Sequence, residues 1–133
     1  MAMAHGIKVS TVNISCPDPP ALARFYAALL GTEIRVEEPD WVVISGGDSV
    51  PLSFELDQHY QPPVWPTEPG KPPIQVHLEV QVADLPGAVE HALACGARLA
   101  DFQPQGDVRV CLDPAGHPFC LWVDETGEDP AAQ

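Results

Sequence analysis

One stretch of the sequence, residues 74–82, brings together side chains that can bind ligands or move protons. It reads Ile-Gln-Val-His-Leu-Glu-Val-Gln-Val, with apolar and polar residues in alternation. Alternate side chains of a β-strand lie on one face, so His77 and Glu79 share a face with Gln75 and Gln81. An imidazole titrates near neutral pH and binds metals, and a carboxylate attracts cations. His77 is therefore the strongest single candidate for a functional side chain.

Two further stretches carry candidate groups. Residues 9–16 alternate in the same way and place Thr11 and Asn13 on one face with Ser15, opposite Val12 and Ile14. A strand-like run over residues 50–56 carries Glu55, which can act as a general base if burial raises its pKa.

The elements that hold these residues occur twice. Asp18 and Asp84 each stand at a predicted helix N-cap, with proline in the first turn, and Gly31 and Gly96 close the two helices. The sequence predicts helices over residues 19–30 and 85–95. Apolar residues recur in them at helical spacing: Leu22, Phe25, Tyr26 and Leu29, then Leu85, Ala88, Val89, Ala92 and Leu93.

Three short strands are predicted after each helix, with turn residues between the last two. Their ranges are 33–37, 41–45 and 50–56, then 98–103, 107–112 and 118–123. The duplication pairs Thr11 with His77, and the alignment of residues 53–56 with 118–121 pairs Glu55 with Cys120. His117, directly after the second turn, is expected to be exposed.

The predicted fold is α+β, with two tandem βαβββ modules in one domain, residues 1–133. Module one covers about 7–56 and module two about 74–124, followed by an acidic tail, 125–133. A connector at 57–73 holds six prolines and is predicted to be extended, with Trp65 as a pocket wall. Curved mixed sheets are expected around a shared cavity. Each helix covers the apolar face of its sheet, so the polar faces line that cavity.

The composition of the sequence limits the classes of molecule that the chain is expected to bind. With 133 residues, 45% hydrophobic, the chain can bury a core. Its net charge of −13 disfavours nucleic acid and anionic membranes and favours a cationic ligand. No apolar run approaches the length that spans a bilayer, and no signal peptide is recognised, so a cytoplasmic location is expected. The four cysteines are interpreted as thiols rather than disulfides.

Two phrases carry a family resemblance. Residues 16–31, Cys-Pro-Asp-Pro-Pro-Ala-Leu-Ala-Arg-Phe-Tyr-Ala-Ala-Leu-Leu-Gly, and residues 112–121, Leu-Asp-Pro-Ala-Gly-His-Pro-Phe-Cys-Leu, resemble the vicinal oxygen chelate superfamily. That superfamily includes glyoxalase I, extradiol dioxygenases and bleomycin-binding proteins. The resemblance covers about residues 7 to 124 and is nearest to a glyoxalase-like branch of largely unassigned function.

The resemblance implies where a metal would bind. In metal-using members, the first and last strands of each module supply ligands, and here those positions are Thr11, His77, Glu55 and Cys120. His77 and Glu55 suit a metal, whereas the Thr11 hydroxyl is a poor ligand. A thiolate binds zinc, so His77, Glu55 and Cys120 form a candidate three-ligand site with an open position. The competing interpretation is that Cys120 is an inert core thiol in an apolar strand.

The broken ligand set favours a small-molecule-binding protein without a complete catalytic metal site and with no cofactor. The expected contacts with a cationic ligand are Thr11, Asn13, Glu55, Trp65, His77, Glu79 and Cys120. The alternative is a metal-dependent lyase or isomerase that uses zinc, so the sequence leaves open whether the protein is an enzyme. A partner-binding domain is a third class. The resemblance also implies a homodimer.

Overall fold

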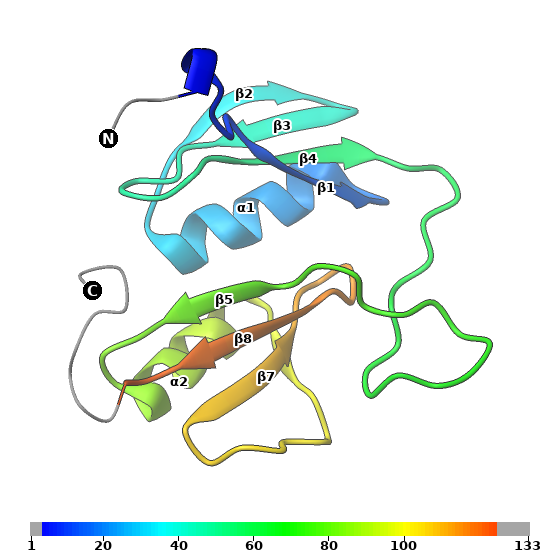
Figure 1. The fold of residues 1–133 in the computed structure, drawn as a ribbon, viewed down its shortest axis with the longest axis vertical. Coiled ribbons are helices and arrows are strands. Elements are labelled where there is room, and N and C mark those ends of the chain that lie inside the picture. Colours follow the sequence, from blue (N-terminus) through cyan, green and yellow to red (C-terminus); the bar gives the residue numbers. More distant parts are fainter. Residues whose placement is uncertain (1–3, 125–133) are drawn as a thin grey trace. The chain divides into compact units, whose positions relative to one another are not determined.

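A computed structural model of the chain describes residues 4–124 (Figure 1). The chain divides into two compact units, Met1–Tyr60 and Gln61–Gln133, with the boundary inside the proline-rich connector. The acidic tail predicted at 125–133 lies outside the described residues. Neither helix in residues 4–124 is long and apolar enough to cross a membrane.

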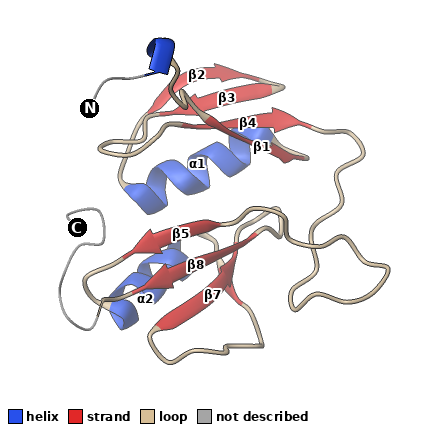
Figure 2. Cartoon of the chain, in the orientation of Figure 1, coloured by secondary structure: helices blue, strands red, loops and turns tan. Residues whose placement is uncertain are grey.

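Unit 1 has the predicted order of one strand, one helix and three strands (Figure 2). A short 3-10 turn, η1 (Ala4–Gly6), precedes them. The elements are β1 (Val12–Cys16), α1 (Pro19–Leu30), β2 (Ile34–Glu38), β3 (Trp41–Ile44) and β4 (Leu52–Leu56). The sheet order is β1-β4-β3-β2, in which β1 and β4 are parallel and the other pairs are antiparallel.

Unit 2 repeats this arrangement. Its elements are β5 (Leu78–Gln81), α2 (Leu85–Cys95), β6 (Arg98–Leu99), β7 (Val108–Leu112) and β8 (Pro118–Trp122). The sheet order is β5-β8-β7-β6, again with one parallel pair, β5 and β8. The predicted α+β fold with two tandem βαβββ modules is therefore confirmed.

The helix ends follow the sequence, with one difference between the units. Gly31 and Gly96 end α1 and α2 with φ of 66° and 122°, which glycine adopts without a Cβ penalty. The Asp18 carboxylate accepts a hydrogen bond from the Ala21 amide at 3.2 Å. Asp84 stands at the equivalent N-cap but forms no side-chain capping bond. Only one of the two predicted aspartate caps is therefore made.

Each helix packs on the apolar face of its own sheet. In unit 1, the ring of Phe54 on β4 stacks on Tyr26 of α1, with centroids 5.6 Å apart and planes 12° from parallel. In unit 2, Phe119 and Leu121 of β8 are fully buried, whereas Cys120 between them is half-buried. Leu93, predicted to lie in the buried stripe of α2, is 42% exposed. The odd-even pattern of the strands therefore leaves a polar face opposite each helix.

Both first strands are shorter than predicted, and a proline explains each. The predicted ranges 9–16 and 74–82 shrink to Val12–Cys16 and Leu78–Gln81. Each parallel ladder ends where its partner strand reaches a proline, Pro51 beside β4 and Pro118 at the start of β8. Proline has no amide hydrogen to donate, so the ladder cannot continue. Val76, predicted to face the helix, is consequently 81% exposed.

Candidate functional site

The polar face of unit 1 is a short hydrogen-bonded row. Ser53, on β4, donates from Oγ to Oδ1 of Asn13 on β1 at 2.7 Å. The Asn13 amide nitrogen donates to Oε2 of Glu55 at 3.3 Å. Thr11 stands half-buried just before β1. The row thus holds neutral hydroxyl and amide groups, ending on the exposed carboxylate of Glu55.

The polar face of unit 2 holds ionisable groups. Glu79 on β5 lies directly across the parallel ladder from Cys120 on β8. His77 stands just before β5, and its Nε2 lies 2.7 Å from Oε1 of Glu79, which as a carboxylate accepts the bond. The imidazole nitrogen, carboxylate oxygen and thiol sulfur all lie within 4.8 Å of one another. His77 and Glu79 are exposed and Cys120 is half-buried, so an incoming cation can reach all three.

The local environment keeps the Cys120 thiol protonated. Burial raises the pKa of Cys120 to about 11, and the neighbouring charge of Glu79 and a hydrogen bond to it raise the pKa in the same direction. Burial likewise raises the pKa of Cys111, on the neighbouring strand β7, to about 11. At neutral pH Cys120 is therefore a poor nucleophile. It becomes a metal ligand only when the metal displaces its proton.

The strand register corrects one pairing drawn from the sequence. Asn13 faces Ser53 in unit 1, and Glu79 faces Cys120 in unit 2. Asn13 and Glu79 each lie five residues before the helix-opening aspartate, so Ser53, not Glu55, is the equivalent of Cys120.

Backbone bonds at the far end of each sheet agree with this register. The amide of Leu56 donates to the Asp40 carbonyl, and the amide of Val123 donates to the Asp107 carbonyl, so Glu55 corresponds to Trp122. The sequence alignment slipped by two residues because the β3–β4 loop covers 45–51, whereas the β7–β8 loop covers only 113–117.

The corrected register separates the two faces by chemistry. Three equivalent positions carry threonine, asparagine and serine in unit 1 but histidine, glutamate and cysteine in unit 2. Neutral hydroxyls and amides are weak ligands for zinc, whereas imidazole, carboxylate and thiolate are its ordinary ligands. The donors of unit 2 fit zinc.

Whether Glu55 joins His77 and Cys120 as a metal ligand, as the sequence suggested, stays a prediction. Glu79 was expected to contact a ligand but not a metal, although strand alternation already placed it beside His77.

A second interaction in unit 2 was not anticipated. His117 is not simply exposed: its Nδ1 lies 2.8 Å from Oδ2 of Asp113. The buried carboxylate of Asp113 also accepts the amides of Ala115 and His117, each at 2.9 Å. The Asp-Pro-Ala-Gly-His phrase was interpreted only as a turn. Aspartate at the first turn position was the available signal for this network.

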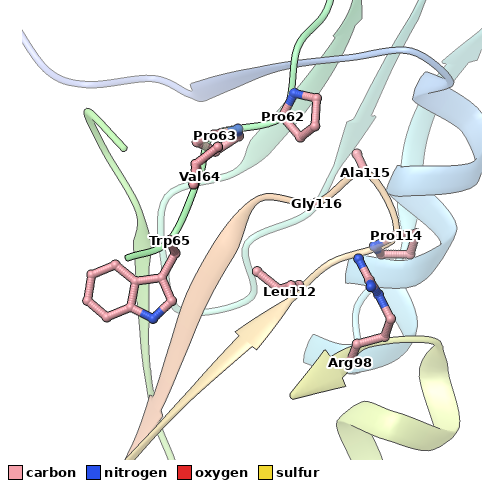
Figure 3. Close-up of a pocket in the computed structure, with 9 residues that line it drawn as sticks. All are labelled: Pro62, Pro63, Val64, Trp65, Arg98, Leu112, Pro114, Ala115 and Gly116. Atoms are coloured by element: carbon pink, nitrogen blue, oxygen red, sulfur yellow. The ribbon is translucent and has the colours of Figure 1, made fainter. Parts of the chain in front are cut away.

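A pocket of about 360 Å³ lies elsewhere in unit 2. The connector, residues 62–65, lines one side, and the β7–β8 turn, residues 114–116, lines another, with Arg98 and Leu112 completing it (Figure 3). Trp65 was predicted to be a pocket wall, and it lines this pocket. Its Nε1 donates to the Phe102 carbonyl at 3.5 Å, and the two rings pack at 6.1 Å.

Comparison with known proteins gives one family and several related folds. Residues 11–122 match the family described as "Glyoxalase-like domain". A glyoxalase/bleomycin resistance protein/dioxygenase family enzyme from Burkholderia phytofirmans PsJN superposes with a TM-score of 0.67 at 22% identity, covering 88% of this chain and 98% of that one. A glyoxalase-related enzyme from Fulvimarina pelagi gives 0.65 at 20% identity, covering 88% of each chain.

A third solved structure is TnmS3, an antibiotic binding protein from Streptomyces sp. CB03234. It gives a TM-score of 0.59 at 17% identity, covering 94% of this chain and 99% of that one. No curated protein matches the sequence. At these identities the solved structures show the shared fold.

Proposed function

We propose that this chain, which belongs to the glyoxalase-like domain family, binds a small molecule through the polar strand faces opposite its helices. The observation that carries the proposal is the His77–Glu79–Cys120 group, whose polar atoms converge within 4.8 Å on an open strand face. Thr11, Asn13 and Glu55 are proposed to bind ligand on the corresponding face of unit 1, whereas Trp65 lines the separate pocket of unit 2. That one protein of this fold is an antibiotic binding protein is consistent with such a role.

The charge of these faces favours a cationic ligand. The four strands that carry them, β1, β4, β5 and β8, contain no lysine or arginine. Glu55 and Glu79 supply carboxylates, in a chain whose net charge is −13. A ligand amine or guanidinium would be attracted both by the nearby carboxylates and by the negative net charge of the chain, whereas an anion would be repelled.

Thermal-shift screening against matched amines, alcohols and carboxylic acids tests this proposal. We expect a cationic compound to raise Tm, and Glu79→Gln to reduce that shift by at least half. Glu90→Gln is the matched control because it removes the same charge from an exposed position on α2 and not from the strand face. Equal shifts for amines and acids, or an undiminished shift in Glu79→Gln, would refute the proposal.

A second function, as a metal-dependent lyase or isomerase, is favoured by one observation. The three donor types in unit 2 are those zinc uses, and they leave a fourth position for substrate or water. In this alternative His77, Glu79 and Cys120 hold the metal, and a bound metal would supply charge to polarise a substrate carbonyl. Glu55 was predicted to act as a general base if buried, but its carboxylate is exposed and accepts a hydrogen bond from Asn13, so the burial on which that prediction depended is not present.

Cobalt titration distinguishes this alternative from metal-free binding. A cobalt ion bound by Cys120 gives sulfur-to-cobalt charge-transfer absorption, which Cys120→Ser removes. The control is Cys95→Ser: Cys95 lies 3.8 Å from His91 on α2 and offers only a two-ligand pair. No cobalt absorption, together with less than about 0.1 zinc per chain in protein purified without chelators, would eliminate the alternative.

Two broader expectations accompany the proposal. The homodimer implied by the family resemblance stays a prediction, and light scattering that gives a strictly monomeric mass would contradict it. The cytoplasmic location also stays a prediction from the sequence, which fractionation of the native cell tests.

A further inference from the structure

Apart from Arg98, the side chains that line the pocket between the connector and the β7–β8 turn are apolar, and exposed backbone groups and Arg98 make nearly half of its surface polar. Proline rings and the indole of Trp65 line the connector side, and Leu112 lies between the two sides (Figure 3). Because Trp65 spends its only donor on the Phe102 carbonyl, its ring presents apolar surface to the pocket. A volume of about 360 Å³ is at the small end of the range for ligand sites and suits one or two rings.

The pocket walls are held in place by bonds within unit 2. The buried carboxylate of Asp113 fixes the turn by accepting two backbone amides and the His117 ring. Gly116, with φ of 92°, lets the connector pack against that turn, because a Cβ there would lie 2.9 Å from the Cβ of Pro62. The Val64 amide donates to the Pro72 carbonyl at 2.8 Å and fixes the connector itself. These interactions hold both walls of the pocket in place.

Arg98 is the single charged side chain that lines this pocket, and Figure 3 shows it rising from β6 toward Pro114. Within the described part of the chain, its guanidinium forms no hydrogen bond or ion pair. Among the described lysines and arginines only Arg24 forms an ion pair, with Glu37. Arg98 is therefore distinguished by its place at the edge of the pocket, not by its lack of an acidic partner. A guanidinium presents a planar pair of donors that matches a carboxylate.

We infer that this pocket binds a flat aromatic carboxylate, with its carboxylate on Arg98 and its ring between Trp65 and the connector prolines. The ligand class follows from one planar cation placed at the edge of a pocket whose other lining side chains are apolar. This site is separate from the strand faces of the proposed function. It also has the opposite charge preference.

An NMR titration of the full chain with 2-naphthoate tests the inference, with 2-naphthylmethylamine as the cationic probe of the same shape. We expect naphthoate to bind with a Kd of roughly 0.1 to 1 mM, the range open to a small ligand in an open pocket. Its shifts should centre on the Trp65 indole. Arg98→Gln should weaken naphthoate at least tenfold, and Arg98→Glu should reverse the preference toward the amine.

Two controls locate the binding. Arg35→Gln removes an exposed arginine from β2 in unit 1 and should leave naphthoate affinity unchanged. The double variant His77→Asn, Glu79→Gln should also bind naphthoate normally, so failure of the strand-face proposal would not affect this result. No saturable binding up to 10 mM (about ten times the weakest Kd expected), wild-type affinity in Arg98→Gln, or loss of binding in the double variant would each overturn the inference.

Discussion

The two units use the same sheet positions for different chemistry. In unit 1, a serine, an asparagine and a glutamate form a row of hydrogen bonds. In unit 2, the positions equivalent to Thr11, Asn13 and Ser53 bring a histidine, a glutamate and a cysteine within 4.8 Å of one another. The backbone register is the same in both, so the difference lies entirely in side chains. A duplicated fold therefore preserves the geometry of a site while each copy is free to lose or gain its reactive groups.

The hairpin before each last strand should show the largest contrast in stability. Asp113→Ala removes a buried acceptor of two amides and one imidazole, so we expect the free energy of unfolding to fall by about 3 kcal/mol. Asp48→Ala, in the exposed turn of the unit 1 hairpin, should cost less than about 0.5 kcal/mol. Urea denaturation of both variants measures the difference. If both variants lost the same free energy of unfolding, the expected difference in stability between the two hairpins would be refuted.

Exchanging side chains between the units tests the contrast in metal chemistry. Replacing His77, Glu79 and Cys120 by the unit 1 residues threonine, asparagine and serine should weaken cobalt binding at least about 100-fold, because no strong donor remains. The reverse exchange, Thr11→His with Asn13→Glu and Ser53→Cys, should give unit 1 a cobalt absorption band of its own. If the variant with the reverse exchange shows no cobalt absorption band, side chains alone do not account for the difference in metal binding between the two faces.

The helix caps offer a smaller contrast. Asp18→Ala removes the carboxylate that accepts the Ala21 amide and should destabilise the protein by about 1 kcal/mol. Asp84→Ala removes a side chain that makes no capping bond, so we expect a loss of less than about 0.3 kcal/mol. Thermal and urea unfolding provide the measurement. An equal cost at both sites would mean that Asp84 caps its helix in solution.

The smallest expected effect is on the rate at which the Cys120 thiol is alkylated. Alkylation by iodoacetamide requires the thiolate, and because the pKa of Cys120 is raised to about 11, its rate should climb as pH rises toward 11. Glu79→Gln removes a charge and a hydrogen bond that both raise this pKa, so the pKa falls and alkylation at pH 8 should accelerate by about threefold. Peptide mass spectrometry follows the reaction, with Glu90→Gln as the unchanged control.

Local patterns in the sequence were enough to predict the elements. Aspartate, proline and glycine placed both helices to the residue, because these signals act through neighbouring backbone groups. Strand alternation correctly put Glu79 on the face of His77. The first strand of each unit was predicted too long because its ladder depends on a proline in the partner strand, far along the chain. The prediction of a strand over 98–103 was also too long, since β6 covers only Arg98–Leu99.

The candidate site could be predicted only in part. The prediction that Glu55 is the equivalent of Cys120 was wrong because the true partner, Ser53, follows from the strand register, which similarity between short segments does not reveal. The Asp113–His117 interaction is local, four residues apart, and the aspartate that opens the turn was a usable signal for it. The Arg98 pocket depends on contacts between segments distant in sequence. The pattern of a single strand carries no information about such contacts.

The longer β3–β4 loop also limits how this family of sheets can evolve. It exceeds its counterpart by two residues, 45–51 against 113–117, and side chains alternate along a strand with a period of two. Here the two extra residues stay within the loop, because Ser53 faces Asn13 just as Cys120 faces Glu79. If inserted residues slid β4 instead, a pair would move it by one full repeat and keep Phe54 on the side of the helix. An insertion of one would turn Phe54 outward and drive Ser53 and Glu55 into the core. Lineages should therefore gain or lose hairpin residues in pairs, unless a bulge absorbs the odd residue.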